Sequence, residues 1–376
     1  MNWLLNRIKG DNVIWGAILL LSLLSILAIY SSTKMLAESA RDGDTMYYVL
    51  KQFAMLGIGF VIIYFAHKIN YKFYSGFSKV LLPISLLLLL LTYMFGIEIN
   101  SAVRWLRIPG TGLTFQTSDI AKLGLIMFLA RTIAKKQDEI KDFKKGFLPL
   151  MIPILVICLV ILPSDFSTSA MLLATSIGLL FIGGAEVKHI GIVLLAAIVG
   201  FFILIGLAEI FDWDFLRLST WISRLNAFFG EDAFQTQQAK IAIAQGKWFG
   251  VGPGNNIQGR FLPGPYGDFI FAIIIEEYGF FGGFLIVFLY LLLLHRSIRI
   301  LIQTPNSFGA LLAVGLTILL VIQAFLHMAV VVDLLPNTGL SLPLVSMGGT
   351  STVFTCFALG VILSVSAHSE KPETAK

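Results

Sequence analysis

The feature that most constrains this chain is a succession of long apolar runs separated by charged or Gly/Pro-rich segments. A helix needs about 20 mostly apolar residues to cross a bilayer, and 57% of the 376 residues are hydrophobic while only 13% are charged. Soluble domains contain roughly 45–50% apolar and about 25% charged residues. The composition therefore excludes an ordinary soluble globule, a disordered chain and a disulfide-stapled scaffold, and it predicts a polytopic membrane protein.

The apolar runs predict an all-α bundle of about ten transmembrane helices, because membrane β-barrels show short alternating segments instead. The expected helices are 13–32, 49–67, 76–96, 118–134, 147–163, 167–184, 189–210, 267–294, 308–332 and 344–367. We expect one integral membrane domain over residues 1–367 and a short polar cytoplasmic tail at 368–376. The long segment 211–266 has helical patterning at 233–247, and a loop of that length is usually functional.

Basic residues in the short loops predict the orientation of the chain. With the N-terminus inside, the cytoplasmic side receives most of the Lys and Arg residues, as the positive-inside rule requires. These residues are Arg7, Lys9, Lys68, Lys72, Lys79, Arg131, Lys135, Lys136, Lys141, Lys144, Lys145, Lys188, Arg296, Arg299, Lys371 and Lys376. The segments 34–48, 97–117, 164–166, 211–266 and 333–343 then lie outside, so the functional face is expected to be extracytoplasmic. The net charge of +5 fits topology anchors better than nucleic-acid binding.

Several familiar kinds of site are not supported by the sequence. Cys158 and Cys356 lie inside apolar runs, which argues against both a disulfide framework and a thiolate metal site. The five histidines show no metal-ligand spacing, so neither a zinc site nor a Ser-His-Asp hydrolase is indicated. GVGPGNN at 250–256 is similar to a phosphate cradle, but it lacks a preceding strand and the Lys-Ser/Thr ending of nucleotide-binding loops.

Ionisable residues at membrane depth are costly and mark functional sites by default. Asp119 and Lys122 stand three apart in QTSDIAK and share one helix face. Asp165 in LPSDFSTS and Asp268 in LPGPYGDFIF also lie at outer helix starts. All four are expected on the same side at similar depth, where they can share one cavity. The alternative is that the three acids only cap helices, as Asp and Ser commonly do.

Other polar residues also have two interpretations. Glu276 and Glu277 lie two turns into the eighth apolar run and are expected to be buried structural carboxylates with partners. Arg104, Trp105 and Arg224 lie on outer segments, where arginines either contact lipid phosphate or clamp a pyrophosphate. The loop LPNTGLSLPLVSMGGTS is irregular backbone at the membrane surface, which is tolerated where it lines a cavity.

Six segments taken together carry a family resemblance. They are NSAVRW, QTSDIAK, SDFST, FQTQQAKIAIAQGKWFGVGPGN, LPGPYGDFIFAIIIEEYG and LPNTGLSLPLVSMGGTS, in chain order and over nearly the whole sequence. They resemble motifs of the SEDS family of bacterial cell-wall glycosyltransferases, the family of RodA and FtsW. Within that family the chain looks closer to the division members, on its GDNVIWG and QTSD regions. The elongation role is kept as an alternative.

The sequence also departs from the family pattern. Ser101 and Thr117 replace a glycine and a proline, and Asp119 replaces a glutamate one methylene longer. Gly264 and Tyr266 stand where many relatives have Glu and His, so any support from those side chains is absent. In addition, His327 occupies a position where Asn is common, and Ser164 and Ser167 replace a proline and a glycine.

The resemblance implies a peptidoglycan glycosyltransferase that polymerises lipid II into β-1,4 glycan strands, with inversion, and releases undecaprenyl pyrophosphate. It implies Asp268 as the catalytic general base. The residues expected to bind substrate are Arg104, Trp105, Asp119, Lys122, Asp165, Arg224, Gln238, Pro336, Gly339 and Ser346. The site is expected at the outer face of the bacterial inner membrane, at the division site.

The resemblance also implies partners and a cofactor class. A divalent cation, Mg²⁺ or Mn²⁺, held by acidic side chains is compatible with a pyrophosphate leaving group, and no organic cofactor is expected. The expected partners are lipid II, the nascent glycan strand, a class B penicillin-binding protein transpeptidase and other divisome membrane proteins. Two rival functions are a lipid II flippase and a non-catalytic scaffold. A flippase needs charges along a path through both leaflets, whereas the candidates cluster at the outer face, and a scaffold leaves them unexplained.

Overall fold

The structure is a computed structural model that describes residues 9–40, 42–99, 102–108, 110, 114–211, 218–230 and 234–369. The chain divides into two compact units. Unit 1 comprises Met1–Lys68, Arg224–Arg299 and Leu320–Ala367, and unit 2 comprises Ile69–Ser223, Ile300–Leu319 and His368–Lys376. The expected single domain over residues 1–367 stays a prediction.

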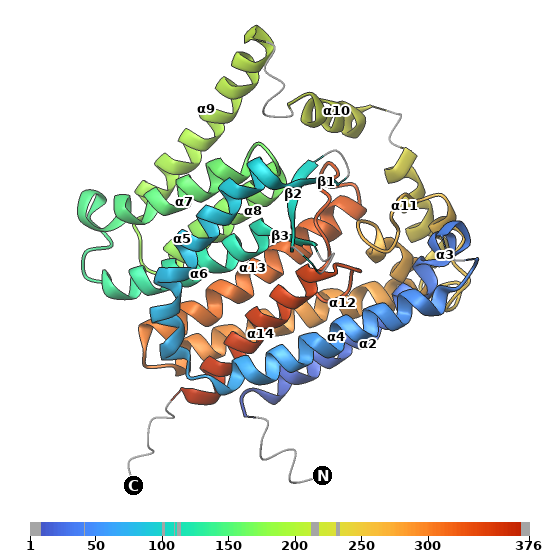
Figure 1. The fold of residues 1–376 in the computed structure, drawn as a ribbon, viewed down its shortest axis with the longest axis horizontal. Coiled ribbons are helices and arrows are strands. Elements are labelled where there is room, and N and C mark those ends of the chain that lie inside the picture. Colours follow the sequence, from blue (N-terminus) through green and yellow to red (C-terminus); the bar gives the residue numbers. More distant parts are fainter. Residues whose placement is uncertain are drawn as a thin grey trace. The chain divides into compact units, whose positions relative to one another are not determined.

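All ten predicted helices are present, and most boundaries agree within a few residues (Figure 1). They are α2 (Asn12–Ser32), α4 (Thr45–Lys68), α5 (Tyr71–Phe95), α6 (Thr117–Lys135), α7 (Leu148–Ile161), α8 (Phe166–Ile182), α9 (Val187–Phe211), α12 (Ile270–Gln303), α13 (Ser307–Val331) and α14 (Thr350–His368). The largest difference is at the end of α12, which runs nine residues beyond the predicted 294. The next is at the start of α14, because residues 344–349 form irregular backbone.

Length and composition identify this chain as a multi-pass membrane protein. Among the described residues, seven helical segments are long and apolar enough to cross a bilayer, one of them formed by α7 and the preceding π-helical turn Phe143–Phe147. Two shorter apolar helical stretches add to them, Phe166–Ile182 and Val187–Ile203. Helix α6 is not among these because it carries Asp119, Lys122, Arg131 and Lys135.

Short elements complete the described chain. Helices α3 (Lys34–Ala40), α10 (Leu218–Phe229) and α11 (Phe234–Gly246) and the 3₁₀ turn η3 (Gln258–Arg260) lie in the connecting segments. Helix α11 confirms the helical patterning predicted at 233–247. A small antiparallel sheet, which the sequence analysis did not predict, is formed by β1 (Ile97–Ile99), β2 (Ala102–Arg107) and β3 (Thr114–Gln116). Strand β3 leads directly into α6.

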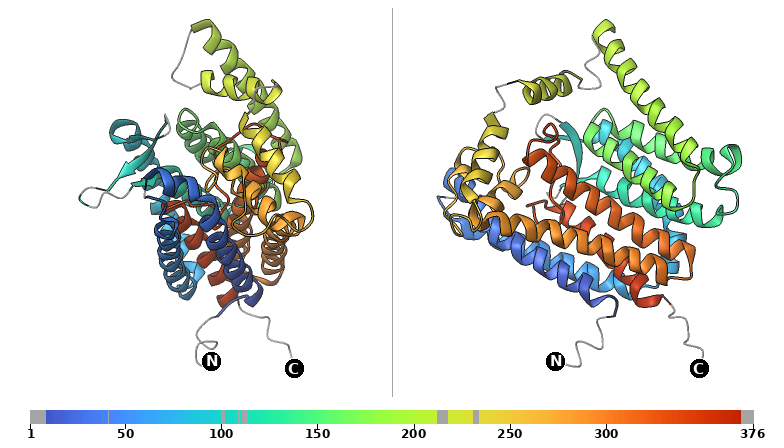
Figure 2. Two further views of the ribbon diagram at one scale, coloured as in Figure 1. Left: turned by 90° about the vertical axis from the view of Figure 1, so that its right-hand side faces the viewer. Right: turned by 180° about the vertical axis from the view of Figure 1, so that it is seen from behind.

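Unit 1 contains closely packed helices with small residues at their contacts. Helix α2 runs beside α4 in every view (Figures 1 and 2). Its first turn is capped by Asp11, whose carboxylate accepts hydrogen bonds from the N–H groups of Val13 and Ile14 at 2.8 and 3.2 Å. Helices α4 and α14 meet at Gly360, where an added β-carbon would lie 2.7 Å from that of Ala66. Such small-residue contacts let membrane helices approach closely.

Unit 2 is built around α6, whose side chains are mostly buried. Helices α5, α7 and α8 and strand β2 all contact α6. In the sheet, Trp105 on the central strand lies opposite Ile97 on one side and Gln116 on the other. This arrangement fixes the sheet against the first turn of α6, where Asp119 and Lys122 lie.

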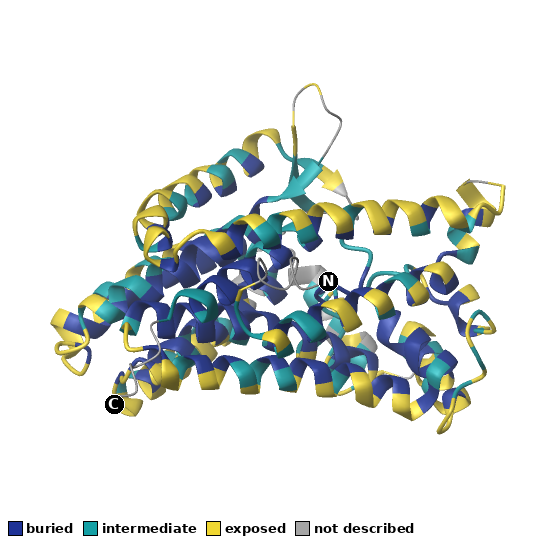
Figure 3. Ribbon diagram, turned by 90° about the horizontal axis from the view of Figure 1, so that it is seen from below, coloured by how far each residue is buried: buried dark blue, intermediate teal, exposed yellow. Residues whose placement is uncertain are grey.

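The outer faces of the helices are apolar. Figure 3 shows helices that carry buried residues along one side and exposed residues along the other. On α2 and α4 the exposed positions include Leu19, Leu23, Phe53 and Phe65. Contiguous apolar surface of this kind is unfavourable in water and fits helices whose outer faces contact lipid tails.

Candidate functional site

The first pair of candidate residues lies in the first turn of α6. Lys122 Nζ is 2.7 Å from Asp119 Oδ1, and the two residues are only 7% and 3% exposed. This ion pair confirms the prediction that the two side chains share one helix face. The second carboxylate oxygen of Asp119 is buried and has no hydrogen-bond partner among the described residues. Because each charge is buried, removal of either partner leaves the other charge uncompensated.

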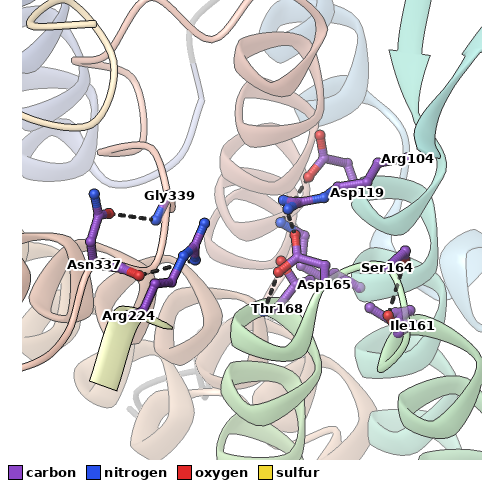
Figure 4. A network of polar contacts seen from close by, with 10 residues as sticks. Arg104, Asp119, Ile161, Ser164, Asp165, Thr168, Arg224, Asn337 and Gly339 are labelled. Carbon is purple, nitrogen blue, oxygen red and sulfur yellow. Dashed lines mark hydrogen bonds and ion pairs between the residues drawn. The ribbon is translucent and has the colours of Figure 1, made fainter. Parts of the chain in front are cut away.

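The second pair joins β2 to the start of α8. Arg104 Nη1 lies 2.8 Å from Asp165 Oδ2 (Figure 4). The other oxygen of Asp165 accepts a hydrogen bond from the N–H of Thr168 at 3.0 Å and so caps α8. The two interpretations of Asp165, helix cap and site residue, are therefore compatible. Arg104 Nε is buried without a hydrogen-bond partner in the described part of the chain.

Unit 2 brings these two pairs together. Strand β2 and helix α8 both contact α6, and Figure 4 shows the side chains of Arg104, Asp119 and Asp165 close to one another. Trp105, the next residue of β2, is half-buried. Two cations and two carboxylates therefore lie at one end of unit 2, with their charges balanced within the protein.

Asp268 lies in a turn of unit 1 immediately before α12. Its N–H donates to the carbonyl of Gly264 at 3.2 Å. The preceding carbonyls are held by the loop before α14: that of Gly267 accepts from Ser346 Oγ at 2.8 Å, and that of Tyr266 accepts from the N–H of Met347 at 3.0 Å. Asp268 is half-buried at this position. Main-chain hydrogen bonds on both sides therefore fix its backbone.

Ser346 and Tyr266 both interact with the turn that carries Asp268. The Ser346 hydroxyl donates to the carbonyl of Gly267 and accepts from the N–H of Leu342 at 2.9 Å, and its role in substrate binding stays a prediction. Burial raises the pKa of Tyr266 above its usual value, and the charges of Tyr48 and Asp268 raise it further. Since the usual tyrosine pKa is about 10, the Tyr266 phenol keeps its proton at neutral pH beside Asp268.

Of the remaining predicted residues of unit 1, Pro336 and Gly339 lie in the loop before α14, Arg224 contacts that loop, and Gln238 lies on α11. Arg224 Nη1 donates to the carbonyl of Asn337 at 3.0 Å (Figure 4). The Asn337 amide donates to Gln235 on α11 at 3.1 Å, and its side-chain oxygen accepts from the N–H of Gly339 at 3.1 Å. On the same loop, Asp333 pairs with Lys240 of α11. Pro336 and Gln238 are both half-buried. The predicted roles of these residues in substrate binding stay predictions.

The Gly-rich segment, which we define as residues 246–258, is joined to α12 by its backbone. Helix α12 is broken at Gly279, which has φ 68° and ψ −165°. The carbonyls of Glu276 and Glu277 accept from the N–H groups of Val251 and Gly252 at 2.9 and 3.1 Å, and the N–H of Phe280 donates to Lys247 at 2.8 Å. The segment thus provides hydrogen-bond partners for main-chain groups of α12 that would bond within the helix if it were unbroken.

Glycine is required where the backbone of the Gly-rich segment meets that of α12. A β-carbon at Gly246, Gly250 or Gly279 would collide with main-chain atoms of the facing segment. Gly250 and Gly279 also have φ values of 81° and 68°, which residues with a β-carbon rarely adopt. The glycines of this motif therefore serve close packing against α12.

Glu276 and Glu277 hold the second half of the Gly-rich segment. Glu276 Oε1 accepts from the N–H groups of Ile257 and Gln258 at 2.7 and 3.1 Å. Glu277 Oε1 accepts from the N–H of Gly254 at 3.1 Å, and it also bonds Asn256 and Ser31. Both glutamates are essentially unexposed, which confirms the expected buried carboxylates with partners. The N–H groups of Val251, Gly252 and Gly254 already donate to α12, which agrees with the sequence analysis in giving no support to a phosphate cradle.

Sequence reasoning missed several of these relations. The pairing of Arg104 with Asp165 joins residues 61 positions apart, and no local pattern signals it. The contacts of Glu276 and Glu277 with the Gly-rich segment were also not foreseen, although the co-occurrence of buried acids and a glycine cluster was visible. Asn100 and Ser101 of NSAVRW lie outside the described residues. The expectation that Asp268 shares one cavity with Asp119, Lys122 and Asp165 stays a prediction.

Solved structures with the same fold support the architecture. The chain superposes with a TM-score of 0.70 on a Thermus thermophilus rod shape determining protein RodA variant, at 23% identity over 96% of this chain and 99% of that chain. It superposes with a TM-score of 0.74 on a chain from work on structural coordination of polymerization and crosslinking by a peptidoglycan synthase complex, at 24% identity over 95% of this chain and 97% of that one.

Sequence comparisons establish the family. Stage V sporulation protein E of Bacillus subtilis is 33% identical over 93% of this chain and 95% of its own length. The probable peptidoglycan glycosyltransferase FtsW of Alkalilimnicola ehrlichii is 35% identical over 93% of this chain and 87% of its own length. The family model for FtsW, RodA and SpoVE, described as cell cycle protein, matches residues 11–371. The chain therefore belongs to the FtsW/RodA/SpoVE family.

Proposed function

We propose that this protein is a peptidoglycan glycosyltransferase that polymerises lipid II into β-1,4 glycan strands. Relatives that span nearly the whole chain carry the name probable peptidoglycan glycosyltransferase FtsW. The observation that carries the mechanism is the presentation of Asp268 in a turn fixed by Ser346 and Met347. A base that removes a proton in a transition state must be held in one place.

In the proposed reaction Asp268 is the general base. The 4-hydroxyl oxygen of one sugar attacks the anomeric carbon of the other substrate, and Asp268 takes the hydroxyl proton. The bond from the anomeric carbon to the pyrophosphate oxygen breaks with inversion, and undecaprenyl pyrophosphate leaves with the electron pair. Because pyrophosphate is already a good leaving group, no second carboxyl is required to protonate it, in contrast to glycoside hydrolysis.

The charges of unit 2 are proposed to bind the pyrophosphate. Arg104 and Lys122 each have one carboxylate partner, and Arg104 Nε has no partner among the described residues. An arginine held in this way can still donate to phosphate oxygens. The other predicted substrate contacts belong to the same proposal: Trp105, Asp119, Asp165, Arg224, Gln238, Pro336, Gly339 and Ser346.

A divalent cation is also part of the proposal, although no step above depends on it. Within the described residues, no group of three or more His, Cys, Asp and Glu side chains is arranged to hold a metal ion. Mg²⁺ commonly binds through one or two carboxylates plus substrate phosphates. The buried oxygen of Asp119 that lacks a partner is the donor that fits such a site.

We further propose that Asp268 and the loop before α14 face outward from the bacterial inner membrane. Two exposed positions test this topology in a background without Cys158 and Cys356: Glu38, expected outside, and Lys141, expected inside. Cysteines at these positions should react oppositely with a membrane-impermeant thiol reagent in intact cells. Labelling of both from the same side contradicts the proposed orientation.

The proposed biological setting is cell division, with a class B penicillin-binding protein as the crosslinking partner and with other divisome membrane proteins. The supporting findings are the FtsW names of several relatives and the fold shared with a chain from a peptidoglycan synthase complex. Depletion of the protein should give filaments if it acts in division. Rounded cells would instead favour the elongation role.

The decisive test is Asp268→Asn, assayed by gel separation of glycan chains made from lipid II by purified protein. Asn keeps the size of Asp and caps a helix about equally well, but it cannot take the proton. We expect normal membrane insertion and lipid II binding with polymerisation reduced by a factor on the order of 10²–10⁴. Near-normal synthesis by this variant would make Asp268 a structural residue and move the search for the base to Asp165 or Asp119.

A further inference from the structure

We propose that Glu276 is a positioning residue for Asp268, acting through the stretch of chain that joins them. This inference rests on the proposed role of Asp268 as the base. Glu276 is buried two turns into α12, and the proposed reaction has no direct use for it. Its carboxylate instead accepts the N–H groups of Ile257 and Gln258, where the Asp268-bearing stretch begins.

Residues 257–269 form a stretch that is held at both ends by the same helix. At its start, Glu276 holds Ile257 and Gln258 from the side of α12. At its end, the chain enters α12 itself at Ile270. Ser346 and Met347 hold the stretch near its end, and Glu276 holds its start, so in this inference the placement of Asp268 depends on both anchors.

Two hydrogen-bonded turns lie between the residues that Glu276 bonds and Asp268. The carbonyl of Gln258 accepts from the N–H groups of Phe261 and Leu262 at 3.0 and 3.1 Å. In the second turn, the carbonyl of Gly264 accepts from the N–H groups of Gly267 and Asp268 at 2.9 and 3.2 Å. Only these two short turns separate the residues that Glu276 holds from the backbone N–H of Asp268.

The N–H groups bound by Glu276 have no other acceptor available from their own element. Ile257 is the N-cap of η3 and Gln258 its first residue, and no side chain of η3 caps it. The first N–H groups of a helix lack partners within that helix. A carboxylate forms stronger hydrogen bonds than a neutral acceptor, so Glu276 supplies from another helix the cap that η3 lacks.

Glu277 provides a matched control. It is the same residue type, one position later, and as fully buried as Glu276. Its carboxylate holds Gly254, Asn256 and Ser31, which lie upstream of the Asp268-bearing stretch. Loss of either glutamate removes a buried carboxylate and loosens a loop, but only Glu276 bonds the start of that stretch.

The first experiment measures amide hydrogen exchange in the full-length protein in lipid nanodiscs, for the wild type, Glu276→Ala, Glu276→Gln and Glu277→Ala. We expect Glu276→Ala to speed exchange across 257–269 at least tenfold and Glu276→Gln, which keeps an acceptor oxygen, to do so much less. Glu277→Ala should speed exchange mainly across 251–256. Unchanged exchange across 257–269 in Glu276→Ala overturns the inference, whatever the activity shows.

The second experiment measures lipid II polymerisation by the same variants alone and combined with Asp268→Asn. A displacement of about 1 Å at a catalytic group can cost on the order of 10²-fold in rate, so Glu276→Ala should lower kcat 10- to 100-fold with KM within about threefold. If Glu276 acts through Asp268, Glu276→Ala should have almost no further effect on the residual rate of Asp268→Asn. If Glu276→Ala lowers the polymerisation rate by the same factor in the wild type and in Asp268→Asn, the positioning role is contradicted.

The two experiments separate failure of this inference from failure of the proposed function. A normal rate for Asp268→Asn overturns the proposed base, while the exchange data still decide whether Glu276 holds the stretch. If Glu276→Ala does not fold, Glu276→Asp replaces it, because its carboxylate is drawn back by one methylene from Ile257 and Gln258. It should then show faster exchange across 257–269 and a lower kcat, and wild-type values for both would overturn the inference.

Discussion

The starts of α6 and α12 both present carboxylates, but they are held by different means. At the start of α6, the buried side chains of Asp119 and Lys122 pair with one another, and nearby the buried Asp165 at the start of α8 pairs with the half-buried Arg104 of β2. At the start of α12, the turn with Asp268 is held mainly by main-chain groups and by Ser346. The first arrangement depends on balanced charge, whereas the second depends on backbone fit. The two regions should therefore respond to different substitutions.

The largest effect is expected from breaking the Asp119–Lys122 pair. Removing one partner of a buried ion pair costs about 3–5 kcal/mol because the remaining charge is uncompensated. Lys122→Ala and Asp119→Ala should each lose most polymerisation activity and lower the thermal unfolding temperature in detergent. The double variant should be no worse than the single variants, which would show coupling. Fully additive losses of activity would show that Asp119 and Lys122 act separately. The start of α6 would then not depend on balanced charge.

The next largest effect is expected at the backbone contacts of α12. Gly250→Ala forces a β-carbon against the carbonyl of Glu277 at a φ of 81°. Left-handed backbone costs roughly 1–2 kcal/mol for a residue with a β-carbon, and overpacking adds about 1–3 kcal/mol. Gly43→Ala is the matched control, since Gly43 has a φ of 86° but no atom near the added carbon. Equal losses of thermal stability in both variants would show that close packing at Gly250 is unimportant.

A smaller effect is expected at Asp165, where the cap and the ion pair can be separated. Asp165→Asn keeps an oxygen for the N–H of Thr168 but removes the charge that faces Arg104. We expect a loss of about 1–2 kcal/mol in stability, and a further loss of about 1 kcal/mol in Asp165→Ala, which also lacks the cap. Thermal unfolding of both variants measures the two contributions. Equal stability of the Asn and Ala variants would show that the cap contributes nothing.

The smallest effect is expected from the titration of Tyr266. Its pKa is raised in the folded protein, so the folded state binds this proton more tightly than the unfolded state does. The resulting stability is present below the usual tyrosine pKa of about 10 and is lost as the pH rises through the folded value. Unfolding temperatures of the wild type and Tyr266→Phe should run parallel from pH 7 to pH 9, and the wild type should fall relative to the variant above pH 10. Divergence near pH 7 would indicate a different titrating group.

Local patterns in the sequence predicted what depends on local chemistry. Apolar run length located all ten main helices, and the spacing of Asp119 and Lys122 predicted their pairing. The β-sheet at 97–116 was missed because its strands are only three to six residues long and are defined by pairing rather than by pattern. The contacts of Arg104 with Asp165 and of Glu276 with Ile257 join positions that are distant in the sequence, so no local sequence pattern predicts them. The assignment of Asp268 came from the family resemblance and not from spacing.

The joining of the Gly-rich segment to α12 also limits how this protein can be engineered. Surface loops normally accept insertions, since each doubling of loop length costs only about 0.6 kcal/mol. Between Lys247 and Gln258 the contacts to α12 recur at 247, 251, 252, 254, 257 and 258. One extra residue there shifts every later contact out of register with its partner. An epitope tag or fluorescent fusion placed in this loop should therefore abolish folding, whereas the turn at Asp42 and Gly43 should accept it.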